Sequence, residues 1–153
     1  MLTKKEKKLN YTIRKIEIKD TQAIIEIDGI HSGEKKLDYW EKRIKHFVDE
    51  QENLTLGFVA EDENKIIGFI LAEGRAWEFG SPLCGWIFGI GVLPEYQRSG
   101  IAVELCKQVC TKFNSLGIST IRTMVKKDDL NVLSFFRSVG FKAGTFFELE
   151  LEI

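Results

Sequence analysis

The chain has 153 residues, and its 22 Lys or Arg and 23 Asp or Glu residues give a formal net charge of −1. Such a balance provides no bulk electrostatic attraction to nucleic acid or to an anionic membrane. The hydrophobic fraction of 44% and the charged fraction of 29% are typical of a globular protein rather than a disordered one. With three cysteines, no CxxC pair and only two histidines, we expect neither a disulfide framework nor a bound metal.

Residues 1–10 are basic and lack an apolar run, so they are predicted to form a flexible arm and not a signal peptide. Residues 11–153 contain no repeat, low-complexity tract or linker, which predicts a single domain. The longest largely apolar run, residues 83–93, is too short to span a bilayer, which takes about 20 residues. We therefore expect a cytoplasmic protein.

The first half of the domain is predicted to contain a strand, two amphipathic helices and a β-hairpin. The strand covers residues 11–19, and Asp20 offers an N-cap for the helix that follows. Residues 37–48 carry apolar side chains at i, i+3, i+7 and i+10, which is helical spacing. The hairpin joins residues 54–61 to residues 65–73 through a short polar turn.

The second half alternates strands and helices. Buried strands are predicted at residues 85–92 and 118–125, helices at residues 100–116 and 131–139, and a terminal strand at residues 141–151. A strand, helix and strand in succession imply parallel or nearly parallel pairing. The order of elements as a whole predicts a mixed α/β (α+β) fold.

The most informative stretch, residues 92–102, runs from a buried strand through a turn begun by Pro94 into the longest predicted helix. Backbone N–H groups at residues 98–102 would be unpaired where the helix dipole is positive, and Gly100 would let a ligand approach closely. Such an arrangement binds a pyrophosphate, and Arg98 would add a charged donor at its rim. The chain contains no GxxxxGK[ST] sequence, so this turn is not a Walker loop.

The same stretch resembles a known family. The hexapeptide Q-R-S-G-I-A at residues 97–102 resembles the Q/R-x-x-G-x-G/A signature of the GNAT superfamily of acyl-CoA-dependent N-acyltransferases, and V-L-P-E-Y before it resembles the usual V-x-P-x-Y lead-in. Residues 131–141 resemble the second signature of that family, N-x-x-(A/S)-x-x-(F/Y)-x-x-x-G-F. The predicted order of elements also fits this family over nearly the whole chain.

The resemblance implies a centrally splayed mixed sheet of six to seven strands with about four helices on both faces. It implies acetyl-CoA as co-substrate, no metal, and attack on the thioester by a primary amine of a peptide, protein or small molecule, with a backbone N–H at residues 90–92 stabilising the oxyanion. The CoA-binding residues that it implies are Ile90, Gly91 and Val92 on the strand, Gln97, Arg98, Ser99, Gly100, Ile101 and Ala102 in the turn, and Asn131 and Phe136 in the last helix.

One departure from the family concerns the proton donor for the leaving thiolate, since Phe136 stands where relatives usually carry Tyr. A thiol with a pKa of about 8.5 can leave as the thiolate near neutral pH at a cost of ~1.5 kcal/mol, so a donor is helpful but dispensable. Tyr96 is an alternative hydroxyl. The side chain of Asn131 could also serve only as an N-cap.

The general base is equally open, because the strands predicted at residues 85–92 and 118–125 contain no acidic residue. Glu73 and Glu78 are the nearest candidates for a catalytic base, although each could be an exposed loop carboxylate. His31, in the first connection between helices, is a further candidate.

Aromatic residues occur just before and within the strand predicted at residues 85–92 and on the second predicted helix. They predict either an apolar acceptor pocket or ordinary core packing. They are Trp40, Trp77, Phe79, Trp86 and Phe88. The leading hypothesis is an N-acetyltransferase without nucleic-acid or membrane partners, and the alternative is a catalytically weak acyl-CoA-binding sensor. An apolar face on residues 141–151 could also be buried in a homodimer.

Overall fold

The computed structural model describes residues 9–49, 54–75 and 80–153. The chain divides into two compact units, Met1–Thr123 and Met124–Ile153. Most of the predicted N-terminal arm, residues 1–8, lies outside the described residues. In the part that is described, no helix is both long enough and apolar enough to cross a membrane.

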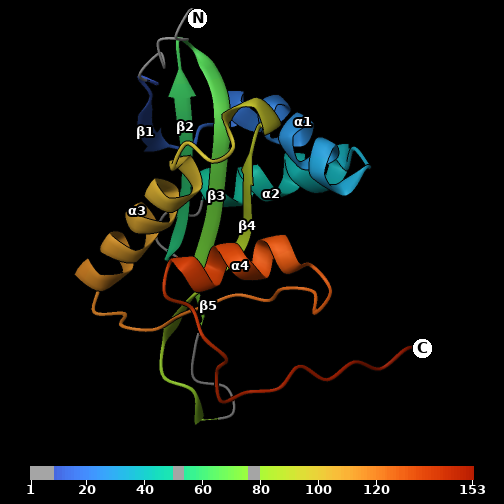
Figure 1. Ribbon diagram of the computed structural model, residues 1–153, viewed down its shortest axis with the longest axis vertical. Coiled ribbons are helices and arrows are strands. Elements are labelled where there is room, and N and C mark those ends of the chain that lie inside the picture. The colour runs from blue at the N-terminus through green and yellow to red at the C-terminus, as the bar shows by residue number, and fades with distance from the viewer. Residues whose placement is uncertain (1–8, 50–53, 76–79) are drawn as a thin grey trace, which may run out of the picture. The chain divides into compact units, whose positions relative to one another are not determined.

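The first unit is built on a five-stranded mixed sheet with the order β1-β2-β3-β4-β5 (Figure 1). The strands are β1 (Thr12–Lys15), β2 (Thr55–Asp62), β3 (Lys65–Arg75), β4 (Cys84–Val92) and β5 (Ile121–Arg122). The first four pair antiparallel, and β5 runs parallel to β4. The hairpin predicted from the sequence is therefore confirmed as β2 and β3. The parallel pairing of β4 with β5 is also confirmed, but the strand predicted at residues 118–125 is too long, since only Ile121–Arg122 pair with β4.

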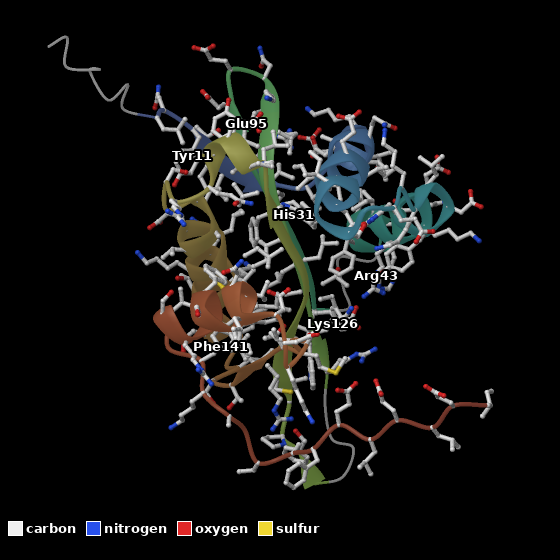
Figure 2. The ribbon with its side chains drawn as sticks, turned by 45° about the vertical axis from the view of Figure 1, so that its right-hand side comes forward. Tyr11, His31, Arg43, Glu95, Lys126 and Phe141 are labelled. Atoms are coloured by element: carbon white, nitrogen blue, oxygen red, sulfur yellow. The ribbon has the colours of Figure 1, made fainter. Side chains whose placement is uncertain are left out.

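Helices cover both faces of this sheet (Figure 2). They are α1 (Thr21–Ser32), α2 (Leu37–Asp49) and α3 (Ile101–Ser115). On β3, a Cβ at Gly68 would meet Ile101 of α3, whereas the neighbouring Phe69 stacks edge-on against Trp40 of α2. Because successive residues of a strand point to opposite faces, α3 lies on one face and α2 on the other.

The apolar stripes predicted for the helices form the core. Trp40, Ile44 and Phe47 of α2 are buried, as are the stripe residues Ile101, Leu105, Val109 and Phe113 of α3. The stripes end earlier than predicted, since Leu37 and Leu116 at their outer ends are half-exposed. Helical periodicity thus located the buried face correctly and overestimated its length.

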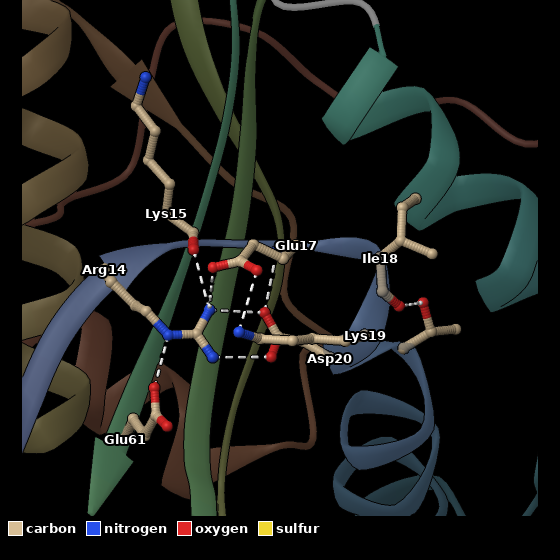
Figure 3. Close-up of polar contacts among 8 residues, drawn as sticks. Arg14, Lys15, Glu17, Ile18, Lys19, Asp20 and Glu61 are labelled. Atoms are coloured by element: carbon tan, nitrogen blue, oxygen red, sulfur yellow. Dashed lines mark hydrogen bonds and ion pairs between the residues drawn. The ribbon is translucent and has the colours of Figure 1, made fainter. Parts of the chain in front are cut away.

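The strand predicted at residues 11–19 stops at Lys15, and an ion-pair network explains why (Figure 3). The carboxylate of Asp20, only 2% exposed, accepts two 2.8 Å hydrogen bonds from the Arg14 guanidinium and one from the backbone N–H of Glu17. Arg14 also bonds Glu61 of β2, and its hydrogen bond with Asp20 raises the pKa of Arg14. Asp20 occupies the N-cap position of α1 but makes no side-chain cap, because its oxygens close this turn.

The second unit contains α4 (Leu130–Ser138), where Asp129, not Asn131, is the N-cap and accepts a hydrogen bond from the Val132 N–H. The terminal strand predicted at residues 141–151 is wrong, since the structure has no strand there. Strand side chains are ordered by a hydrogen-bonded neighbour, and here Phe147 and Leu149 are more than nine-tenths exposed. The described chain therefore has five strands rather than six to seven, and a homodimer through this segment stays a prediction.

Candidate functional site

The middle of the sheet opens along β4. This strand pairs with β3 from Cys84 to Val92, but it pairs with β5 only at Gly85 and Trp86. The hydroxyl of Thr123 donates to the Ile87 carbonyl at 3.1 Å. Beyond that point no described strand pairs with the outer edge of β4, and an edge of this kind can pair with another extended chain.

A β-bulge marks the start of this open half. Leu71 of β3 is opposite Gly89 and Ala72 is opposite Ile87, so Phe88 is the extra residue on β4. A bulge re-aims the side chains on either side of it. A Cβ at Gly85 would meet Phe113 of α3, whereas a Cβ at Gly89 would approach Trp40 of α2.

The open half of β4 leads through the short 3₁₀ turn η4 (Pro94–Tyr96) into the start of α3. Arg98 and Gly100 both adopt positive φ angles, 62° and 84°, and the Ser99 hydroxyl donates to the Tyr96 carbonyl. Within the described chain, the backbone N–H groups of residues 98–103 donate to no protein acceptor. Unpaired amides at a helix N-terminus form a concavity that suits an anion.

The end of α1 is fixed at the base of the same turn. His31 Nε2 lies 2.9 Å from the Val92 carbonyl oxygen, so this nitrogen donates its hydrogen to the carbonyl. Gln97 Nε2 also donates to Val92, at 3.4 Å. The predicted base candidate His31 therefore uses Nε2 to hold α1 against the end of β4.

A cluster of charged side chains from α2 and β3 lies near the bulge. Glu73 Oε1 is 3.1 Å from Arg75 Nε, and its Oε2 is 3.9 Å from Arg43 and 3.7 Å from His46. Both oxygens of this candidate base thus lie within 4 Å of a guanidinium. We name Arg43, Glu73, Arg75 and Phe88 the arginine cluster.

Phe88 connects this cluster to β4. Its ring is 39% exposed, and the guanidinium carbons of Arg43 and Arg75 each lie 4.9 Å from its centroid. Phe88 is thus a surface platform for two cations rather than a core residue. Sequence reasoning missed both arginines, because nothing in their local sequence shows that α2, β3 and β4 bring them to one ring.

The other predicted residues fall into three groups: some lie outside the described residues, some are packed in the first unit, and some belong to the second unit. Glu78, Trp77 and Phe79 lie outside the described residues. Trp40 is core, and Trp86 is half-buried. Asn131 and Phe136 belong to the second unit, where the Phe136 ring packs against Phe135 and Phe141 at centroid distances of 5.1 and 5.0 Å.

The cysteines and the acidic side chains suggest no further chemistry. Burial raises the pKa of the Cys106 thiol to about 12, and it also raises the pKa of Cys110. Thiols of this kind are poor nucleophiles. No group of three potential metal ligands occurs among the side chains that the structure describes.

Comparisons with solved structures show what this fold resembles. The aminoglycoside N-acetyltransferase AAC(6')-Iy in complex with CoA superposes with a TM-score of 0.81 and 17% identity over 94% of this chain and 95% of that one. AAC(6')-Ih from Acinetobacter baumannii gives 0.75 and 19% over 94% and 100%. A possible acetyltransferase from Clostridium difficile 630 gives 0.77 and 19% over 94% and 97%.

None of the curated proteins matches the chain significantly in sequence. The family model for the acetyltransferase (GNAT) family, by contrast, matches residues 14–141. That match includes all of the sheet except Thr12 and Ile13 of β1, together with the open half of β4 and both sequence signatures. The chain therefore belongs to the GNAT acetyltransferase family.

Proposed function

We propose that this protein transfers an acetyl group from acetyl-CoA to a primary amine of a small molecule, peptide or protein. One observation carries the proposal: the open half of β4 leads through η4 into the unpaired amides at the start of α3, within one compact unit. The amides of residues 98–102 would hold the pyrophosphate. Ile90, Gly91 and Val92 in the open half of β4 would hold the pantetheine amides as a neighbouring strand does, although the Val92 carbonyl already accepts from His31 and Gln97.

In the proposed reaction, the lone pair of a neutral amine attacks the thioester carbonyl carbon. A backbone N–H in the open half of β4 stabilises the oxyanion. The C–S bond then breaks, CoA leaves as the thiolate, and the extra proton of the new amide nitrogen passes to water. Phe136, assigned to the pantetheine side by the family resemblance, supplies no proton, and thiolate departure costs only ~1.5 kcal/mol near neutral pH.

The nature of the amine follows from the surroundings of Glu73 and His31, the two candidate bases that the structure describes. Glu73 is engaged by cations, and His31 Nε2 is engaged by Val92. A Lys side chain with a pKa of about 10.4 requires ~4 kcal/mol to be neutral near pH 7.4, whereas an α-amine near 7.8 requires almost nothing. The proposal therefore favours a weakly basic amine.

The test combines CoA binding with turnover. Calorimetry with CoA measures binding, and release of free thiol from acetyl-CoA in the presence of an amine panel measures transfer. We expect both binding and amine-dependent thiol release. CoA binding without thiol release from any amine would instead support the acyl-CoA sensor, and a folded protein that does not bind CoA would contradict both readings.

A further inference from the structure

The arginine cluster carries more positive than negative charge. Its two guanidiniums share the single carboxylate of Glu73, and the Glu73 side chain is only 14% exposed. An anion is attracted to such a pair of cations, whereas a polycation is repelled. The excess of positive charge in the arginine cluster therefore favours a negatively charged group on a molecule bound beside β4.

The hydrogen-bonding capacity of the cluster is also incomplete. In the described part of the chain, the buried Nε of Arg43 has no hydrogen-bond partner, and a terminal nitrogen of the same guanidinium is 3.9 Å from the Glu73 carboxylate, beyond hydrogen-bond distance. A buried donor without a partner is costly. A ligand oxygen bound at the cluster would relieve the weak pairing of this guanidinium.

The cluster lies within reach of the open strand. Arg43 projects from α2, on the side of the sheet where α1 and α2 pack (Figure 2), and it contacts Phe88, the bulged residue of β4. Phe88 is two residues from Ile90, which corresponds to about 7 Å along a strand. The acyl carbonyl is expected beside residues 90–92. An anionic group bound over Phe88 is therefore separated from that carbonyl by a distance that a small amine can span.

We infer that the acceptor is a primary amine that also carries a carboxylate, and that Arg43 and Arg75 bind this carboxylate beside the ring of Phe88. The inference rests on the proposed acetyl transfer and specifies its acceptor. The shared chemistry is an α-amine with a carboxylate several bonds away, as in the α-amide of an acidic amino acid or in a peptide with an acidic residue near its N-terminus. The polycationic aminoglycosides named for two structural neighbours carry the opposite charge.

The experiment compares amines that differ in charge but hardly in amine pKa. One pair is glutamic acid α-amide and glutamine amide, of which only the first carries a carboxylate, and the other is the C-terminally amidated tetrapeptides Ala-Glu-Ala-Ala and Ala-Gln-Ala-Ala. The aminoglycoside kanamycin is the polycationic comparison. We expect kcat/KM for the acidic member of at least one pair to exceed that of its neutral partner by about tenfold, as for a hydrogen bond to a charged group. The pair that responds identifies the source of the carboxylate.

Variants then assign the preference to the cluster. Arg43→Gln and Arg75→Gln should reduce the preference to less than about threefold, chiefly through KM, and Arg43→Lys should retain part of it. Lys42→Gln removes an exposed charge from the same helix and should leave the preference unchanged. Thermal unfolding of each variant shows whether the fold is retained.

The outcomes separate this inference from the proposed function. Equal kcat/KM within both pairs, better turnover of kanamycin, or an unchanged preference in both arginine variants would overturn the inference while leaving acetyl transfer intact. If no amine is acetylated, the proposed function fails, and calorimetric titration of the two tetrapeptides into the CoA-saturated protein still tests the carboxylate site. Tighter binding of the acidic peptide supports the site, and equal or absent binding overturns it.

Discussion

Backbone groups form one side of the proposed site, whereas side chains form the other. On the proposed CoA side, the unpaired amides of residues 98–103 and the free edge of β4 provide the contacts. On the acceptor side, the contacts come from the arginine cluster, which α2, β3 and β4 assemble. The first side depends on conformation and the second on charge, so the two should respond differently to substitution.

The largest effect is expected at Gly100 on the backbone side. Gly100→Asp should weaken CoA binding about a hundredfold or more, because a carboxylate would stand among the amides that bind the pyrophosphate. Nothing lies within 4 Å of a Cβ at this position, and Asp tolerates a positive φ, so the protein should fold. Gly100→Asn, with the same shape and no charge, is the control. Unchanged CoA affinity of folded Gly100→Asp by calorimetry would show that the amides are not the anion site.

A second backbone effect should appear in the open half of β4 as a loss of stability. A Cβ at Gly91 would lie 2.9 Å from Ile27 Cγ2 and from Phe69 Cε1, both of which belong to buried side chains. Gly91→Ala should therefore lower the free energy of unfolding by about 1–3 kcal/mol, measured by urea denaturation. At Gly89 the nearest atoms are 3.4 and 3.7 Å away, so Gly89→Ala should be tolerated. Similar losses in the free energy of unfolding of both variants would mean that steric contacts of the added Cβ do not determine which glycine of β4 can be replaced.

A smaller effect is expected when the counter-ion of the arginine cluster is removed. Glu73→Gln should change kcat by less than about threefold and lower KM for a carboxylate-bearing amine, since it frees two guanidiniums. If Glu73 were instead the general base, kcat would fall by about a hundredfold or more. The decrease of kcat at low pH that results from protonation of the base would also disappear from the pH profile. Steady-state kinetics from pH 6 to 9, with CoA affinity measured separately, decides between these roles.

The smallest effect is expected at Phe136. Phe136→Tyr should leave turnover nearly unchanged or raise it by about twofold, because thiolate departure without a donor costs only ~1.5 kcal/mol. The ring stays between Phe135 and Phe141. A hundredfold loss of kcat with intact CoA affinity would contradict a donor-free departure, and it would indicate that another group, such as Tyr96 or an ordered water, already protonates the thiolate.

Local signals in the sequence were sufficient for much of the fold and for one side of the site. The stripe of Trp40, Ile44 and Phe47 located the buried face of α2, and the Q-R-S-G-I-A signature located the turn before α3, where Gly100 has a φ of 84°. These features are encoded by residues a few positions apart, because helical periodicity and turn geometry depend on neighbours in the chain.

Only the tertiary structure decided the rest. The strand predicted at residues 11–19 ends early because Asp20 pairs with Arg14, and the alternating residues 141–151 form no strand although their pattern resembles one. Arg43, Glu73 and Phe88 come from three elements and meet through the packing of α2 on the sheet and through the bulge in β4. Interactions of this kind depend on partners distant in sequence, and no local pattern specifies which charged side chains will share a carboxylate or a ring.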